Sequence, residues 1–152
     1  AEYIGSNHKT VVLNHRDLVN SLNNAVLGRD LPGMADVDSS LYLFCKEVKK
    51  DFVIALSGEC ADELFGGYPW FTNEDMINAN TFPWSRFIGE RKAILSPELK
   101  DLKIEEVANQ AYLDTLKEVP YLSGESKLEK RMRELFYLNL RWFMVNLLNR
   151  KD

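Results

Sequence analysis

Three carboxylates lie within five residues of one another, directly after an unbroken apolar run. Glu59, Asp62 and Glu63 follow residues 52–56 (FVIAL) and the pair Ser57-Gly58. The run is short and shows no alternation, which predicts a strand covered on both faces. Open α/β sheets bind their ligands where such a strand passes through a tight turn into a helix. We therefore expect a binding site at this turn.

The charges of the turn restrict what the site can bind. A helix start offers unpaired N–H groups that suit a phosphate, yet three carboxylates repel a bare phosphate. A metal ion or a positively charged reactant must therefore take part. Asp62 follows Glu59 by three residues and lies on the same side of the first helical turn. Asp62 can bind Mg²⁺ or merely offset the helix dipole, and Glu59 can transfer protons or merely cap the helix. Glu63 is interpreted as a solvated first-turn residue.

The sequence SGECADELFGGYPWF, residues 57–71, carries a resemblance to a known family. It is similar, without gaps, to the SGExxDExFGGYxxF signature in the synthetase domain of the asparagine synthetase (glutamine-hydrolysing) family. Flanking positions occur in the family's order: Ala1, Ile4, Gly5, His8, residues 30–32, Leu147, Leu148, Arg150 and Asp152. The resemblance spans essentially the whole chain but only a middle portion of the family's synthetase domain.

The resemblance implies an α/β but mostly helical fold. The chain would be a truncated part of a PP-loop (adenine nucleotide alpha-hydrolase-like) parallel-sheet domain that lacks its first strands. It also implies a ligase of asparagine biosynthesis, in which ATP and Mg²⁺ activate aspartate as an acyl-adenylate and ammonia then attacks. By resemblance, Glu59 is the catalytic acid/base, Ser57 and Gly58 line the ATP, and Asp62 is a magnesium ligand. The ammonia would come from glutamine in an N-terminal glutaminase domain.

Two alternatives remain open beside this reading. The chain can belong to another amide- or β-lactam-forming member of the superfamily, although β-lactam-forming members carry Tyr at the position of Glu59. It can also be a noncatalytic helical binding module that kept the strand and turn as structure. ATP–Mg²⁺ binding by the chain joined to its missing N-terminal part would separate an enzyme from such a module.

The family's pyrophosphate loop, of the form SGGxDS, has no counterpart in this sequence. Its only Gly-Gly pair is Gly66-Gly67, which Tyr68 follows. We therefore expect the polypeptide alone to be inactive as a synthetase. In the family's sheet the strand at residues 52–56 pairs with the strand before that loop, so the fragment is expected to self-associate or rearrange to cover the exposed edge.

The elements that must position the turn follow from the apolar spacing. We expect one domain, residues 1–152, with an α/β part at 1–68 and a helical part at 69–152. Residues 10–13 predict a second strand. Asn14 predicts the cap of one helix and Ser126, with Glu129, the capping box of a long last helix. The four aromatics Trp70, Phe71, Phe82 and Trp84 are expected to pack in the core.

Composition narrows the class further. The chain has 152 residues, 45% of them hydrophobic, and a formal net charge of −4, which argues against a nucleic-acid surface. No apolar run reaches the ~18 residues of a membrane span. Two cysteines, Cys45 and Cys60, are too few for a disulfide framework and predict a cytoplasmic protein. The chain has no initiator Met and starts inside an apparent motif, so we interpret it as a piece of a longer polypeptide.

Overall fold

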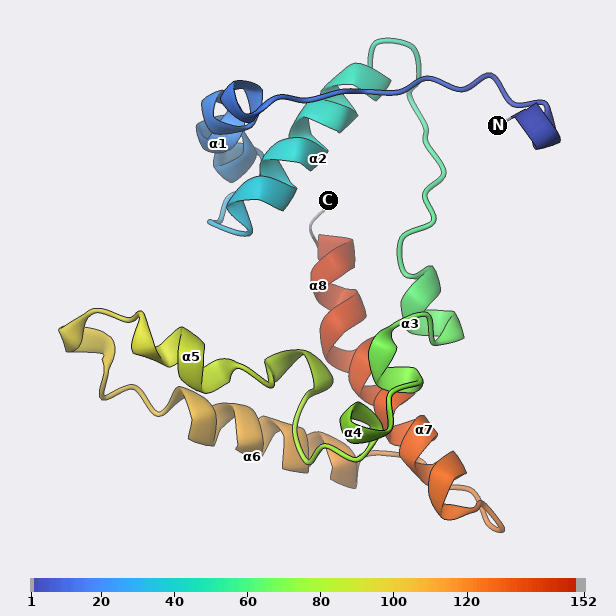
Figure 1. The fold of residues 1–152 in the computed structure, drawn as a ribbon, viewed down its shortest axis with the longest axis vertical. Helices are drawn as coiled ribbons and strands as arrows, with labels where there is room; N and C mark the ends of the chain where they lie inside the picture. Colours follow the sequence, from blue (N-terminus) through green and yellow to red (C-terminus); the bar gives the residue numbers. More distant parts are fainter. Residues whose placement is uncertain (1, 150–152) are drawn as a thin grey trace. The chain divides into compact units, whose positions relative to one another are not determined.

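The structure is a computed structural model that describes residues 2–149, and every regular element among these residues is helical (Figure 1). The elements are the 3₁₀ turns η1 (Glu2–Ile4), η2 (Pro69–Phe71), η3 (Pro83–Ser85) and η4 (Pro97–Leu99), the helices α1 (His15–Arg29), α2 (Ala35–Val48), α3 (Ala61–Phe65), α4 (Glu74–Ile77), α5 (Ile88–Ala93), α6 (Ile104–Lys117), α7 (Lys127–Leu138) and α8 (Met144–Asn149), and the π-helical turn η5 (Asn139–Phe143). The prediction of a mostly helical chain is confirmed. Within residues 2–149, no helix is both long enough and apolar enough to cross a membrane.

The described residues form two compact units, which we call unit 1, residues up to Ser57, and unit 2, residues 58–149. The boundary lies inside the Ser57-Gly58-Glu59 turn rather than near residue 68. Whether the chain is one domain in the whole protein stays a prediction. Asp152 and Arg150, which contribute to the family resemblance, and Ala1 lie outside the described residues.

Unit 1 is a pair of packed helices, α1 and α2. Asn14 begins α1 with the predicted cap, since its side chain accepts from the Asp17 N–H at 3.0 Å and the Asp17 side chain accepts from the Asn14 N–H. Small buried side chains, Ser21 and Ala25, allow close packing. Near the loop that connects the two helices, Arg29 of α1 forms an ion pair with Asp38 of α2 at 2.9 Å.

The two predicted strands are absent from this structure. Residues 52–56 run as irregular chain, and the side chains of Phe52, Val53, Ile54 and Leu56 are exposed. Residues 10–13 are likewise irregular, although Val11 and Leu13 are half-buried. A strand exists only when a neighbour accepts and donates its backbone hydrogen bonds, and within residues 2–149 neither run has one. The prediction of strands at these positions is therefore wrong for this structure.

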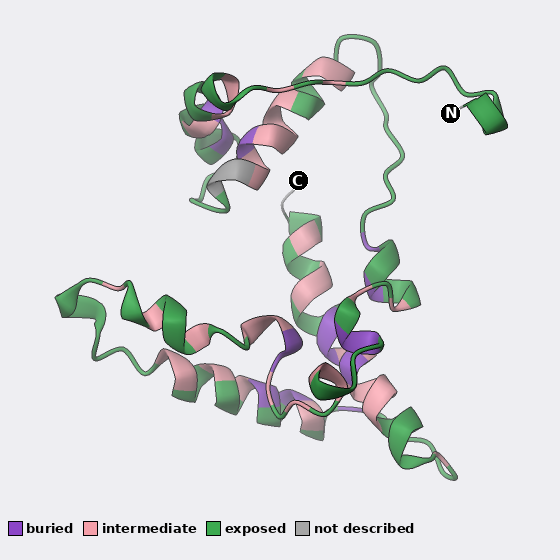
Figure 2. Ribbon diagram, in the orientation of Figure 1, coloured by how far each residue is buried: buried purple, intermediate pink, exposed green. Residues whose placement is uncertain are grey.

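Unit 2 is organised around its C-terminal helical stretch, in which α7, η5 and α8 follow one another without a break. Ser126 begins α7 with the predicted capping box, which Glu129 completes. The elements α4 and α6 pack against α7, and α3 packs against η5. The buried residues of this unit gather where these elements meet, whereas residues 52–59, before the buried Cys60 and α3, are exposed (Figure 2).

An aromatic core joins η2 and α6 to the C-terminal helices. Trp70 and Phe71 are buried against Leu135, and Phe82 is buried against Tyr112 and a second leucine of α7. Trp84 is half-buried and contacts both clusters. The prediction that these aromatics pack in the core is confirmed.

Arg131 of α7 connects three further segments of unit 2. Its Nε donates to the carbonyl of Ile77 at 2.5 Å and its Nη2 to the carbonyl of Ala79 at 2.7 Å. Its Nη1 donates to the Tyr112 hydroxyl at 3.1 Å and to Glu134 at 2.6 Å. This side chain is only 15% exposed. It supplies hydrogen bonds to two backbone carbonyls at the end of α4 and just after it, and it links this segment to α6 and α7.

Candidate active site

The turn between the two units has a defined backbone geometry on its unit 2 side. The Gly58 carbonyl accepts from the Ala61 N–H at 3.2 Å, and Cys60 adopts a left-handed conformation with φ of 70°. Cys60 is buried, and its carbonyl accepts from the Leu64 N–H at 3.2 Å. A left-handed conformation is uncommon for a residue other than glycine, and Cys60 adopts it directly before α3.

The three acids of the signature do not share one environment. Glu59, at the turn, and Asp62, in the first turn of α3, are exposed. Glu63, the next residue, is only 1% exposed and points into unit 2. The interpretation of Glu63 as a solvated residue is therefore wrong. The sequence places Glu63 in the expected helix, but it does not tell which side of so short a helix faces the core. That side depends on residues further along the chain.

The two glycines that follow α3 have different structural roles. Gly66 ends the helix with φ of 73°, where an added Cβ would also lie 3.2 Å from Phe136. Gly66 thus occupies the position after a helix where a left-handed glycine is common. Gly67 has a role that the sequence did not reveal, since a Cβ there would lie 2.0 Å from the Asp62 Oδ1. The Asp62 carboxylate thus lies over Gly67, and only glycine leaves room for it in this position.

Tyr68 is the hydrogen-bond partner of the buried acid. Its hydroxyl donates to the Glu63 carboxylate. The Tyr68 ring is stacked on Trp70, with ring centres 4.2 Å apart, and meets Phe143 edge-on at 5.4 Å. Burial raises the pKa of the Tyr68 hydroxyl well above its usual range, and the bond to Glu63 and the charges of Glu63, Asp62 and Glu59 raise it further. The negative charges of all three acids therefore act on the Tyr68 hydroxyl.

The described residues offer part of a site for Mg²⁺ and a nucleotide. Within residues 2–149 no group of three or more His, Cys, Asp or Glu side chains can hold a metal ion by itself. Magnesium in nucleotide sites, however, is bound by one or two carboxylates and completed by phosphates and water. The exposed Asp62 fits this role as a single protein ligand. The space beside Gly58 is open, because an added Cβ would have no atom within 4 Å.

Ser57 belongs to unit 1 and Gly58 to unit 2. Both are exposed. The roles predicted for Ser57, Gly58, Glu59 and Asp62 stay predictions. Sequence reasoning missed the pair formed by Glu63 and Tyr68. An acid five residues before a tyrosine is too common a pattern to predict such a pair.

Comparison with known proteins gives consistent matches. The sequence model of a family described as asparagine synthase matches residues 1–152. The chain is 55% identical over 152 residues to "Asparagine synthetase [glutamine-hydrolyzing] 3" of Bacillus subtilis, a match that covers 99% of this chain and 24% of the relative. It is 36% identical over 75 residues to the asparagine synthetase of Rattus norvegicus, covering 47% of this chain and 13% of the relative. The chain thus spans about a quarter of the length of the Bacillus relative.

Proposed function

Because this chain belongs to the asparagine synthase family, we propose that it is part of the synthetase domain of a cytoplasmic, glutamine-hydrolysing asparagine synthetase. The observation that carries the proposal is the ungapped signature of residues 57–71, within a chain that is similar over nearly its whole length to a protein of that name. The substrates would be aspartate, ATP and ammonia. An N-terminal glutaminase domain of the full-length protein would release the ammonia from glutamine.

The proposed reaction has two steps. The side-chain carboxylate of aspartate attacks the α-phosphorus of ATP, which forms an aspartyl-adenylate and releases pyrophosphate. Ammonia then attacks the acyl carbon, and the carbon–oxygen bond to AMP breaks. When bound, Mg²⁺ supplies charge neutralisation of the phosphates in the first step.

This chain's own residues have three roles in the proposal. Glu59 accepts a proton from the nitrogen that attacks the acyl carbon, and its exposure at the turn leaves the carboxylate accessible to substrate. Asp62 offers one carboxylate oxygen to Mg²⁺. Ser57 and Gly58 lie along the nucleotide, where the absence of a side chain at Gly58 permits close approach of the backbone.

We expect the 152-residue chain alone to form no asparagine from ammonia, aspartate and ATP. The chain spans about a quarter of its Bacillus relative and contains no SGGxDS loop, so the backbone donors that such a loop offers to pyrophosphate must come from elsewhere. The full-length protein, assayed in parallel with ammonia as nitrogen donor, is expected to release AMP, pyrophosphate and asparagine in equal amounts. Asparagine formation by the short chain, or none by the full-length protein, would contradict the proposal.

The exposed run at residues 52–56 has a place in the same proposal. In the whole synthetase domain it would be a strand of a parallel sheet, paired with a strand that precedes this chain. Four large apolar side chains in this run are exposed in the short chain. We expect the short chain to self-associate through this run, with a sedimentation coefficient that rises with concentration. A constant monomer value, shared with a Val53→Lys variant, would exclude this.

A further inference from the structure

Glu63 is held in the interior of unit 2 by a hydrogen bond that its carboxylate accepts from the Tyr68 hydroxyl. A buried carboxylate without a hydrogen bond costs several kcal/mol, about the whole margin of a small domain's stability. The bond to Tyr68 is therefore needed for Glu63 to lie where it does. Because Glu63 sits in the middle of α3, whatever fixes Tyr68 also fixes that helix.

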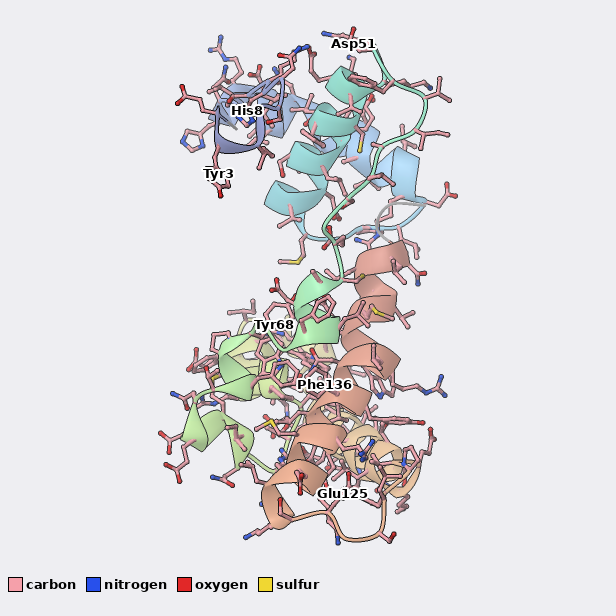
Figure 3. The ribbon with its side chains drawn as sticks, turned by 90° about the vertical axis from the view of Figure 1, so that its right-hand side faces the viewer. Tyr3, His8, Asp51, Tyr68, Glu125 and Phe136 are labelled. Carbon is pink, nitrogen blue, oxygen red and sulfur yellow. The ribbon has the colours of Figure 1, made fainter. Side chains whose placement is uncertain are left out.

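Tyr68 is fixed from the other side of the core. Its ring lies between Trp70 of η2 and Phe143 of η5, at centre distances of 4.2 Å and 5.4 Å. Figure 3 shows the Tyr68 side chain beside the C-terminal helical stretch. The position of its hydroxyl is thus set by packing that does not involve α3. Because this hydroxyl donates to Glu63, it restrains the position of α3.

The helix that receives this restraint, α3, is too short to be stable by itself. α3 has five residues, and isolated helices of that length are unstable in water. It nevertheless carries Asp62 directly beside Glu63, and Glu59 precedes it by two residues. Both exposed carboxylates act on the Tyr68 hydroxyl through their charge. A rotation of α3 would move Asp62 directly, and because only Cys60 separates Glu59 from the helix, it would shift Glu59 as well.

We propose that Glu63 and Tyr68 are a positioning pair, whose buried hydrogen bond fixes the rotation of α3 and so the direction in which Asp62 and Glu59 are presented to the magnesium–nucleotide complex. The inference rests on the function proposed above. Neither residue touches substrate in this scheme. Losing the bond should weaken the contribution of Asp62 to metal binding rather than merely lower the amount of folded protein.

The test uses the full-length synthetase with Tyr68→Phe, which keeps the ring packing and removes the donor. We expect the Mg²⁺ concentration for half-maximal activity to rise about 10-fold, the low end of the effect when a hydrogen bond that orients a metal site is lost. Mn²⁺ binding in the presence of a non-hydrolysable ATP analogue, measured by electron paramagnetic resonance, should weaken by a similar factor. Glu63→Gln keeps an oxygen that accepts from Tyr68 and should stay close to wild type in both measurements.

A double variant separates positioning from stability. Glu63→Met with Tyr68→Phe replaces both partners by apolar groups of similar shape, which is nearly neutral for folding. It should melt close to the wild-type temperature and still require the higher Mg²⁺ concentration. Tyr121→Phe is the matched control, because it removes a Tyr–Glu hydrogen bond of 2.8 Å to Glu134, in the same unit but away from α3.

Each outcome bears on one of the two proposals. Wild-type Mg²⁺ dependence and Mn²⁺ binding in the double variant would overturn the positioning role, as would an equal effect of Tyr121→Phe. A raised Mg²⁺ requirement together with weakened Mn²⁺ binding in Glu63→Gln would also overturn the positioning role. The hydrogen bond, which Gln can still accept, would then not be what maintains metal binding. If the unsubstituted full-length protein instead forms no asparagine from ammonia, aspartate and ATP, the proposed function fails, independently of how these variants behave.

Discussion

In the full-length synthetase, Glu59→Ala is expected to lower the rate of asparagine formation by about 10²- to 10⁴-fold, the usual contribution of a general base. The carboxylate is exposed at the turn, so its removal leaves no cavity and should cost little stability. The assay uses ammonia as the nitrogen donor, because glutamine would add the activity of a second domain. The melting temperature is measured on the same preparation.

The two steps of the reaction make this expectation more specific. If Glu59 acts on the nitrogen, aspartate-dependent exchange of pyrophosphate into ATP should persist in Glu59→Ala while amide formation is lost. Glu90→Ala, which removes an exposed carboxylate from α5 of the same unit, is the control and should change neither rate. An unchanged rate of asparagine formation in Glu59→Ala would refute the catalytic role.

Helix starts could be predicted from the sequence because their signals are local. Asn14 with Asp17 and Ser126 with Glu129 form their capping boxes within four residues, and both are present in the structure. The aromatic core could be predicted as well, since clustered large rings bury more readily than they remain exposed. For the site, the same local reading located the acidic turn and the helix that follows it.

The parts that could not be predicted depend on partners distant in the chain or absent from it. A strand at residues 52–56 needs a neighbouring strand, and among the described residues none pairs with it. The burial of Glu63 depends on how Tyr68 packs against Phe143, 75 residues further on. Arg131 reads as an ordinary surface charge of an amphipathic helix until the carbonyls that it binds, 54 and 52 residues away, are seen.

Arg131→Met should destabilise unit 2 by about 3 kcal/mol, the lower end of the cost of removing one member of a buried ion pair, because both side chains are only part-buried. The variant leaves Glu134, 18% exposed, without its cation and two backbone carbonyls without their donor. All three tryptophans of the chain lie in unit 2, so their fluorescence during urea unfolding reports this unit. The midpoint of the transition is expected to fall, with a change in slope if the unfolding loses cooperativity.

The control for this prediction is the same substitution at a cation with a different environment. Arg141 lies 3.8 Å from Glu118, but its side chain is 63% exposed, and ion pairs of that kind contribute about 0.2–1 kcal/mol or nothing measurable. Arg141→Met should therefore leave the midpoint almost unchanged. Equal shifts for the two variants would mean that Arg131 acts only as a surface charge. A large shift for Arg131→Met alone would show that the contacts of its part-buried guanidinium, to Glu134 and to the two backbone carbonyls, stabilise unit 2.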